Sequence, residues 1–366
     1  LEDRLLLTRH VRYWGDEIAI VVAEDSLTAA KAVNLIKVEY EPYDPLLTPS
    51  AALEKDARQI HAGSDNTIGE SQYTAGGDIE KVLDAADVVL EQRYQTQVTQ
   101  HCHIENHIAI AYMDDLEHIV VVSSTQIPHI ARRIVGEALD LPWSRIRVVK
   151  PYIGGGFGAK QDVILEPMVA FLTMKLGGRP VKLDLSREEC MIGTRVRHPF
   201  DIKLRAGVNQ DGELVGLDID AISNTGAYAS HGHSVAGAAG AKSRLLYPRA
   251  ATKYHARPVD TNIPAAGAMR AYGAPQIMFA LESMMEEAAR RIGMDSVEFR
   301  MKNVARPDDR DPFTDKPFTS CAMVDCLKRG KTLIDWDHKK AAKAKAPSGP
   351  LRRGLGVACF SYATGT

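Results

Sequence analysis

The chain has 366 residues, of which 45% are hydrophobic and 25% are charged, and its formal net charge at pH 7 is -2. The length is sufficient for two or three domains, and the composition is ordinary for a globular protein. The nearly balanced charge argues against nucleic acid as a partner, because a phosphate-binding surface usually carries a clear basic excess.

The lack of a recognisable targeting signal and the pattern of cysteines favour a cytoplasmic location. No run of about 18 apolar residues is present, so we expect no membrane-spanning helix, and the N-terminal residues do not resemble a signal peptide. The chain starts without Met and stops soon after a strand-like stretch, which suggests a fragment. The cysteines are odd in number and form no C-x-x-C pair, so we expect no disulfide scaffold, zinc ribbon or iron–sulfur cluster; they are Cys102, Cys190, Cys321, Cys326 and Cys359.

The first predicted elements form a strand–helix–strand unit. Residues 17–23 are an apolar, strand-like run, and residues 27–36 repeat apolar side chains at helical spacing behind Asp25 or Ser26 as the cap. Residues 38–43 alternate in polarity, as a half-buried strand does. Together these elements predict a small α/β domain that closes near residue 60.

The middle of the chain alternates between strands and helices. Strands are predicted at residues 88–94, 119–123 and 145–149, and a helix is predicted at about 128–139. The third strand leads into a glycine run at residues 154–158 (Gly-Gly-Gly-Phe-Gly), after which we expect a helix through Met174.

The second half combines a hairpin with a long helix. Residues 209–212 (Asn-Gln-Asp-Gly) predict a hairpin turn. Residues 275–292 predict a helix with one buried stripe, followed by Gly293 at the position where a helix-ending glycine belongs. Residues 339–350 have the composition of a linker, and residues 354–362 resemble another strand.

The glycine run at residues 154–158 is the strongest local signal for a binding site. Glycines permit positive φ and let a backbone approach another group closely. Free N–H groups at the start of the following helix would favour an anionic ligand. The pattern is neither G-x-G-x-x-G nor a Walker loop. By itself it is equally compatible with a tight strand-to-helix turn.

Two further clusters could contact a ligand. Gln126 stands at a strand end, where its amide could donate one directed hydrogen bond, although the neighbouring Thr125 could simply cap the next helix. Arg270 lies in a loop rich in Gly and Ala at residues 266–275. A guanidinium there favours a phosphate or carboxylate ligand, or an ordinary salt bridge.

A metal site in residues 101–107 is an alternative. If this segment is a strand, His101, His103, Glu105 and His107 share one face and could hold zinc or iron. Chance clusters of this kind are common, so we favour a structural role for these residues.

Taken together and in this order, the motifs resemble the xanthine oxidase family of molybdenum hydroxylases. The resemblance covers essentially the whole chain and looks closest to bacterial members that are split over several subunits. The segments that carry it are LTRHVRYWGD at 7–16, STQIPH at 124–129, GGGFGAKQ at 154–161, LSREEC at 185–190, SNTGAYAS at 223–230 and GAMRAYG at 267–273.

The resemblance implies roles for individual residues. Gln126 matches a glutamine that hydrogen-bonds an oxo ligand of molybdenum, and Tyr272 matches an aromatic residue that sandwiches a flat substrate. In this family no side chain ligates the metal, because the pterin cofactor holds it. The backbone near the metal corresponds to Gly156, Phe157 and Gly158, and the loop that holds the cofactor corresponds to Ala268, Met269 and Arg270.

The implied enzyme hydroxylates its substrate with water as the oxygen source. Its cofactor would be molybdenum bound to molybdopterin, with the cytosine dinucleotide as one candidate form. Electrons would leave through 2Fe-2S clusters to FAD on partner subunits, because nothing in this chain could bind those centres. The favoured substrate is a purine, with hypoxanthine or xanthine converted to urate.

The chain departs from the family pattern in two respects. Gln161 stands where vertebrate-type members carry a glutamate that anchors the purine, and the arginine that pairs with it is not evident; His231, His233 and Lys242 are the polar residues nearby. We assign Gln161 to the substrate pocket and, with Gln126, to catalysis. The family's catalytic glutamate lies in a Gly-Glu-Pro sequence that is absent here, so a further chain or segment should complete the site.

The resemblance also implies an α+β fold in three parts. Residues 1–62 correspond to part of an α/β hammerhead domain, and residues 63–338 to the first half of an elongated, mixed α/β molybdopterin-binding region. Residues 339–366 correspond to a linker and the truncated start of a second such domain. Two other functions stay open: an aldehyde or nicotinate-like N-heterocycle hydroxylase on the same scaffold, and a non-catalytic fragment.

Overall fold

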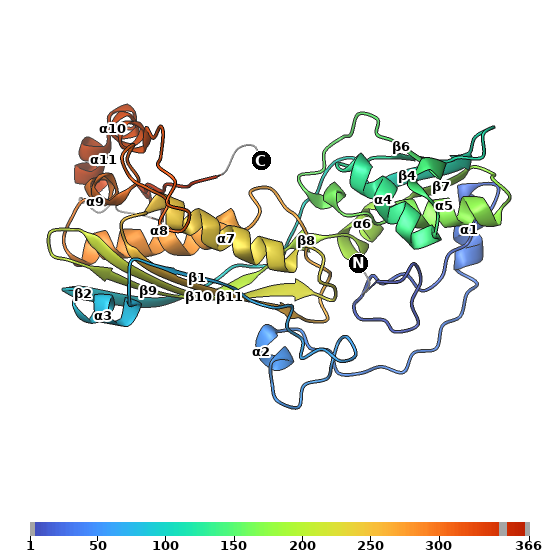
Figure 1. Cartoon of the computed structure of the whole chain (residues 1–366), viewed down its shortest axis with the longest axis horizontal. Coiled ribbons are helices and arrows are strands. Elements are labelled where there is room, and N and C mark those ends of the chain that lie inside the picture. The colour runs from blue at the N-terminus through green and yellow to red at the C-terminus, as the bar shows by residue number, and fades with distance from the viewer. Residues whose placement is uncertain (1–3, 344–349, 363–366) are drawn as a thin grey trace.

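Two main β-sheets organise the chain, one in each lobe of an elongated molecule (Figure 1). The computed structural model describes residues 4–343 and 350–362. Helices cover both sheets, and parallel and antiparallel strand pairs occur in each. This mixed architecture confirms the expected α+β fold class.

The larger sheet has the strand order β1-β11-β10-β9-β2. Only β10 and β11 pair in parallel, and α7 (Gly232–Leu246) makes the crossover that a parallel pair requires. Helices α7 and α8 (Ala274–Arg291) lie on one face of the sheet, and the short α3 (Ile79–Asp84) lies on the other (Figure 1). The strands are β1 (Ser71–Ala75), β2 (Val88–Gln95), β9 (Phe200–Val208), β10 (Leu214–Gly226) and β11 (Ala251–Asp260).

The main hydrophobic core lies between this sheet and α8. Ile202, Leu204 and Ile219 from the strands are fully buried and belong to the same cluster as Leu281 and Met284 of the helix. Apolar side chains at helical spacing give α8 one continuous buried stripe. The stripe predicted from sequence is therefore confirmed.

The smaller sheet has the strand order β6-β5-β4-β7. Strands β5 and β6 pair in parallel across α4 (Pro128–Leu139), whereas β4 pairs antiparallel with both β5 and β7. Helix α5 (Glu166–Lys175) packs on the same sheet through Val169 and Ala170. The strands are β4 (Ile108–Met113), β5 (Ile119–Ser123), β6 (Ile146–Val149) and β7 (Val181–Asp184).

Short elements complete the fold. A two-stranded pair, β3 with β8, lies between the two lobes (Figure 1). The elements are β3 (Thr99–Gln100), β8 (Val196–Arg197), α1 (Ser26–Val33), α2 (Pro49–Ala52), η1 (Trp143–Arg145), η2 (Ala159–Gln161), α6 (Arg187–Gly193), α9 (Ser296–Asn303), α10 (Met323–Leu333) and α11 (Trp336–Lys343).

Most predicted elements with a strong local signal are confirmed. The strands predicted near residues 88–94, 119–123 and 145–149 are β2, β5 and β6. The hairpin turn joins β9 to β10. The first helix is capped as predicted, because the Thr28 N–H donates to the Asp25 carboxylate at 2.8 Å.

The strands predicted at residues 17–23 and 38–43 are wrong. Neither segment belongs to a ladder in the part of the chain that the structure describes. A strand needs a neighbour to satisfy its backbone groups, and here the Glu17 carbonyl accepts a single bond from the Thr8 N–H at 2.9 Å. Without a covering layer, Val38 and Tyr40 are exposed.

Three other expectations need correction. In α4 the apolar spacing predicts a buried stripe of Ile130, Ile134, Val135 and Ala138, but the buried residues are Ala131, Val135 and Gly136, so the helix is rotated from this stripe. Residues 339–343 continue α11 where we expected a linker, and residues 344–349 lie outside the described residues. Residues 354–362 form no strand.

Candidate functional site

Three segments that are distant in sequence meet between the lobes. The Gly158 N–H donates to Gln126 Oε1 at 2.9 Å, and the Gln126 N–H donates to the Lys160 carbonyl oxygen at 2.8 Å. On the other side, the Arg270 N–H donates to the Phe157 carbonyl oxygen at 2.8 Å. The structure therefore brings together the three clusters that the sequence singled out.

Only glycine fits at two positions of the run. A Cβ at Gly156 would lie 2.5 Å from Gln126 Oε1, and one at Gly158 would lie 2.6 Å from the Ala268 carbonyl oxygen. Gly158 also has a φ of 103°, and the intervening Phe157 has a φ of 53°. Glycine permits both close approach and positive φ. At Gly158 these features allow the glycine run to contact the loop of residues 268–270.

A buried ion pair supports the glycine run from below. Lys160 is 1% exposed, and its Nζ lies 2.5 Å from Glu105 Oε2. The same carboxylate accepts the Gly154 N–H at 2.9 Å. Burial opposes ionisation of Glu105, but Lys160 and Gly154 outweigh it and hold the pKa of the carboxyl below its usual value. The sequence pattern placed Glu105 in a candidate metal cluster and gave no sign of this anchoring contact.

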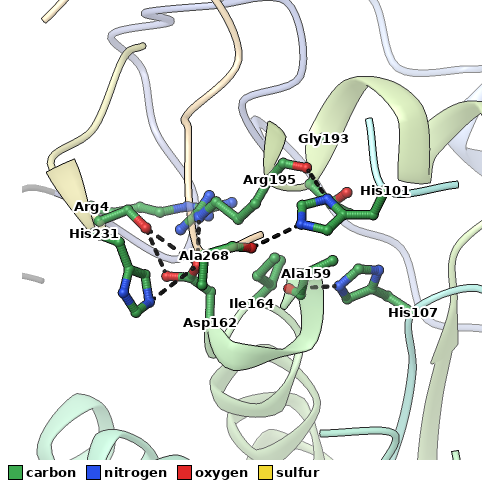
Figure 2. A network of polar contacts seen from close by, with 12 residues as sticks. Arg4, His101, His107, Ala159, Asp162, Ile164, Gly193, Arg195, His231 and Ala268 are labelled. Carbon is green, nitrogen blue, oxygen red and sulfur yellow. Dashed lines mark hydrogen bonds and ion pairs between the residues drawn. The ribbon is translucent and has the colours of Figure 1, made fainter. Parts of the chain in front are cut away.

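The alternative metal site in residues 101–107 is wrong. No strand aligns these side chains, and Cys102 has a φ of 52°. His101 points at backbone carbonyls instead, with Nε2 2.8 Å from the Ala268 oxygen (Figure 2). Across residues 4–343 and 350–362, no group of three or more His, Cys, Asp and Glu side chains could hold a metal ion.

The glycine run itself offers hydrogen-bond donors. The N–H groups of Gly155, Gly156 and Phe157 donate no hydrogen bond within the described part of the chain. We expected a helix N-terminus to supply such donors, but α5 begins only at Glu166. Its carboxylate accepts the Ile164 N–H at 3.1 Å and the Ser123 hydroxyl at 2.6 Å, so these polar groups are satisfied internally.

Gln126 and Arg270 each have side-chain donors that form no hydrogen bond among the described residues. Gln126 Oε1 is occupied by Gly158, which leaves Nε2 without a hydrogen bond among the residues described. The Arg270 side chain is exposed and likewise makes no ion pair or hydrogen bond within those residues. The Thr125 hydroxyl accepts the Ile127 N–H at 3.1 Å, but α4 has no side-chain cap.

The remaining candidates line the same region. Met269 adjoins the glycine run, since its Cα would lie 2.9 Å from a Cβ at Gly158. Gln161 is half-buried, and its amide has no partner in the described chain. Tyr272 is half-buried, and its hydroxyl lies 2.6 Å from His231 Nδ1.

This arrangement fits an anionic group with oxo ligands. Among the residues that the structure describes, three backbone N–H groups, the Gln126 amide nitrogen and the Arg270 guanidinium are donors without partners, and a guanidinium suits phosphate oxygens in particular. Donors fixed in the backbone need no reorganisation when a charged ligand binds. Side-chain metal ligands are not required for such a group.

Family models match both regions of the chain. Residues 60–304 match the model of the molybdopterin cofactor-binding domain. Residues 1–44 match the a/b hammerhead domain of aldehyde oxidase and xanthine dehydrogenase. The first match covers the whole candidate site.

Individual proteins agree with the family models. The chain is 53% identical over 364 residues to the putative xanthine dehydrogenase molybdenum-binding subunit XdhA of Escherichia coli K12. The aligned region covers 100% of this chain and 48% of that protein. It is 34% identical over 302 residues to the nicotinate dehydrogenase large molybdopterin subunit of Eubacterium barkeri, covering 82% and 70%. The solved aldehyde oxidoreductase from Desulfovibrio gigas superposes with a TM-score of 0.84 at 28% identity, over 89% of this chain and 36% of that one.

The matches also define the extent of the chain. It spans about half the length of the xanthine dehydrogenase subunits that it matches. Within the described residues, none of the helices combines the length and the apolar character needed to cross a membrane.

Proposed function

The chain belongs to the molybdopterin cofactor-binding family of the aldehyde oxidases and xanthine dehydrogenases, and we propose that it forms part of a xanthine dehydrogenase molybdenum-binding subunit. The reaction would be hydroxylation of a purine, hypoxanthine or xanthine to urate, with water as the oxygen source. The 53% identity to xanthine dehydrogenase subunits over the whole chain supports this substrate class.

One observation carries the assignment of the site. The Gly158 N–H donates to Gln126 Oε1, and this bond holds the side-chain amide with Nε2 directed away from Gly158. The amide therefore offers one donor in a fixed direction, next to the N–H groups of the glycine run that donate no bond among the described residues. A directed donor beside backbone N–H groups supports a contact with an oxo ligand.

The molybdenum–molybdopterin cofactor would be held by backbone and Arg270. Gly156, Phe157, Gly158, Ala268 and Met269 would form its cradle. Bound there, the metal would supply Lewis-acid chemistry that activates water near neutral pH. The chain's own contribution is to orient the cofactor, to donate hydrogen bonds from Gln126, and to place Gln161 and Tyr272 beside the substrate.

The complete enzyme requires partners. We propose that a further chain or segment supplies the second half of the cofactor site, with the Gly-Glu-Pro glutamate as general base. Separate subunits would carry 2Fe-2S clusters and FAD, the pterin would be a candidate for the cytosine dinucleotide form, and the assembly would be cytoplasmic. Residues 1–62, 63–338 and 339–366 would be the hammerhead part, the first molybdopterin-binding half, and the linker with the start of the next domain.

Substitution of Gln126 by Glu tests the proposal. The carboxylate can still accept the Gly158 N–H but cannot donate, so kcat should fall by about 100- to 1,000-fold, as for loss of a fixed donor at a developing charge. Molybdenum content, measured by mass spectrometry on the full complex, should stay near the wild-type level.

The matched control is Gln59→Glu. Gln59 Oε1 also accepts a glycine N–H at 2.9 Å, from Gly63, but lies outside the site. Equal activity of the Gln126→Glu variant and this control would overturn the role of Gln126. A full complex without molybdenum would instead favour the non-catalytic reading.

A second candidate function is hydroxylation of an aldehyde or a nicotinate-like N-heterocycle. The Gln161 amide, which has no partner among the described residues, favours it, because an amide cannot provide the charge of a carboxylate. The 34% identity to a nicotinate dehydrogenase subunit gives further support. Comparing kcat/KM for xanthine, nicotinate and an aromatic aldehyde separates the two functions.

A further inference from the structure

Tyr272 lies in a backbone turn that is held from two sides. Ala271, Tyr272 and Gly273 have successive φ values of 71°, 43° and 87°, and residues with side chains adopt this left-handed region only infrequently. Lys242 Nζ donates to the Tyr272 carbonyl oxygen at 3.0 Å, and His231 Nδ1 lies 2.6 Å from the Tyr272 hydroxyl. Such backbone persists only where its surroundings hold it, so these contacts determine where the aromatic ring lies.

A buried carboxylate orients His231. Asp162 Oδ2 lies 3.8 Å from His231 Nε2 (Figure 2), whereas the Tyr272 hydroxyl lies near the other ring nitrogen, Nδ1. Asp162 also accepts the Ser230 hydroxyl at 3.0 Å and faces Arg195 Nε at 3.3 Å. Its side chain is 6% exposed, so the carboxylate is held in a fixed position.

The charge of Asp162 favours one tautomer of His231. A carboxylate facing Nε2 favours the ring hydrogen on that nitrogen, which leaves the Nδ1 lone pair to accept from the Tyr272 hydroxyl. The two rings meet edge to face, with centroids 5.5 Å apart and an interplanar angle of 89°. The Tyr272 hydroxyl is therefore paired with His231, and the ring cannot rotate without losing this contact.

We propose that Asp162 and His231 are positioning residues that fix the Tyr272 ring for stacking against a flat heterocyclic substrate. The inference rests on the proposed function, because it assumes that Tyr272 faces the substrate. Asp162 directly follows Gln161 in the sequence. The same short segment therefore places Gln161 itself and, through Asp162 and His231, the Tyr272 ring, which are the two residues that we assign to the substrate pocket.

The test compares His231→Phe, Tyr272→Phe and the double variant in the full molybdenum-loaded complex. Loss of ring orientation weakens binding of ground state and transition state alike, so KM should rise about three- to tenfold while kcat changes less than about twofold. In the Tyr272→Phe background, His231→Phe should have no further effect on KM, because the hydroxyl that it positions is already gone. His231→Asn keeps an acceptor near the Nδ1 position and should restore a KM close to wild type.

A second readout does not depend on turnover. The dissociation constant of the product urate, measured by calorimetry on the same complexes, should rise by the same factor as KM. His255→Phe is the matched structural control, because His255 is 27% exposed against 26% for His231 and also pairs with a carboxylate, that of Asp220 at 3.0 Å. It lies on β11, outside the site, and should change neither KM nor urate binding.

The outcomes are separable. A wild-type complex that neither oxidises a purine nor binds urate overturns the purine function, and the inference with it. A working wild-type enzyme whose His231→Phe variant keeps the wild-type KM and urate affinity overturns the positioning role alone. An additive effect of the two Phe substitutions on KM also overturns it, because His231 would then act independently of the Tyr272 hydroxyl.

Discussion

At the scale of single residues, the candidate site depends on groups that leave no room for substitution. The clearest case is Gly158, whose N–H, positive φ and missing side chain allow contacts with two other segments. Its N–H donates to Gln126 and its Cα faces the Ala268 carbonyl. A side chain there would separate the two loops that form the cofactor cradle.

Gly158→Ala should therefore abolish cofactor retention. The added Cβ meets backbone that cannot move away easily, and a positive φ costs Ala about 1–3 kcal/mol in addition. We expect molybdenum content and kcat/KM of the full complex to fall by more than about tenfold. Gly177→Ala is the control, since Gly177 also has a positive φ of 67° but would place its Cβ in open space. Equal molybdenum content in the two variants would contradict the cradle.

At the scale of elements, one buried polar network joins the helices on the larger sheet. Arg300 of α9 is fully buried, and its Nε donates to Glu282 Oε2 of α8 at 2.7 Å. Tyr247, which follows α7, donates its hydroxyl to Glu282 Oε1 at 2.6 Å, and burial raises its pKa well above the usual value. The Cys359 N–H adds a bond from the C-terminal segment at 2.8 Å. Glu282 therefore organises four parts of the chain.

Arg300→Leu should destabilise the protein strongly. Removing one partner leaves the Glu282 carboxylate buried without its countercharge, which typically costs about 3–5 kcal/mol. Chemical denaturation of the full-length subunit, followed by circular dichroism, should show a correspondingly lower midpoint. Arg290→Leu provides the contrast, because Arg290 is 75% exposed in its pair with Glu287 and should contribute less than about 1 kcal/mol. Similar midpoints for the two variants would show that Arg300 does not anchor α9.

At the scale of the whole molecule, two buried histidines lie in the interior of the fold. His107 directly precedes β4 of the smaller sheet, and His198 lies two residues before β9 of the larger sheet. Burial lowers the pKa of each to about 3. Neighbouring cationic groups oppose protonation further, Lys160 near His107 and Arg197 near His198. Both rings are therefore neutral in the folded state at any pH near neutrality.

These histidines should make the protein sensitive to mild acid. Below about pH 6.5 the unfolded chain binds protons that the folded chain cannot, so the free energy of unfolding decreases as the pH falls from about 6.5 towards about 3. Each histidine should lower the free energy of unfolding by about 1–2 kcal/mol at about pH 5. Denaturation midpoints of the full-length subunit at about pH 7.5 and pH 5 measure this loss.

His198→Asn should reduce the loss of stability between the two pH values. His338→Asn is the control, because His338 is 78% exposed and should leave the pH dependence unchanged. An unaltered pH dependence in the His198→Asn variant would mean that other groups are responsible for acid sensitivity.

Sequence periodicity predicted the elements whose own residues supply their packing surface. Helix α8 carries its buried stripe in sequence, and β2 and β5 carry their strand patterns, so their existence was predictable. The strand at residues 17–23 was not, because a strand's backbone bonds come from a neighbour that its own sequence does not specify. The prediction of which side of α4 is buried was wrong for a similar reason, since the sheet that packs against the helix determines which side is covered.

The sequence by itself determined the family, through motifs spread over the whole chain, and it singled out Gln126, the glycine run and Arg270. Only the tertiary structure decided that Gly158 locks the Gln126 amide, that Glu105 and Lys160 support the loop, and that Asp162 and His231 hold Tyr272. These contacts join residues far apart in the chain, and no local pattern encodes which distant side chain will fill a given hydrogen-bonding position. Spacing reveals periodic burial, whereas the pairing of buried polar groups is settled by which segments the fold brings into contact.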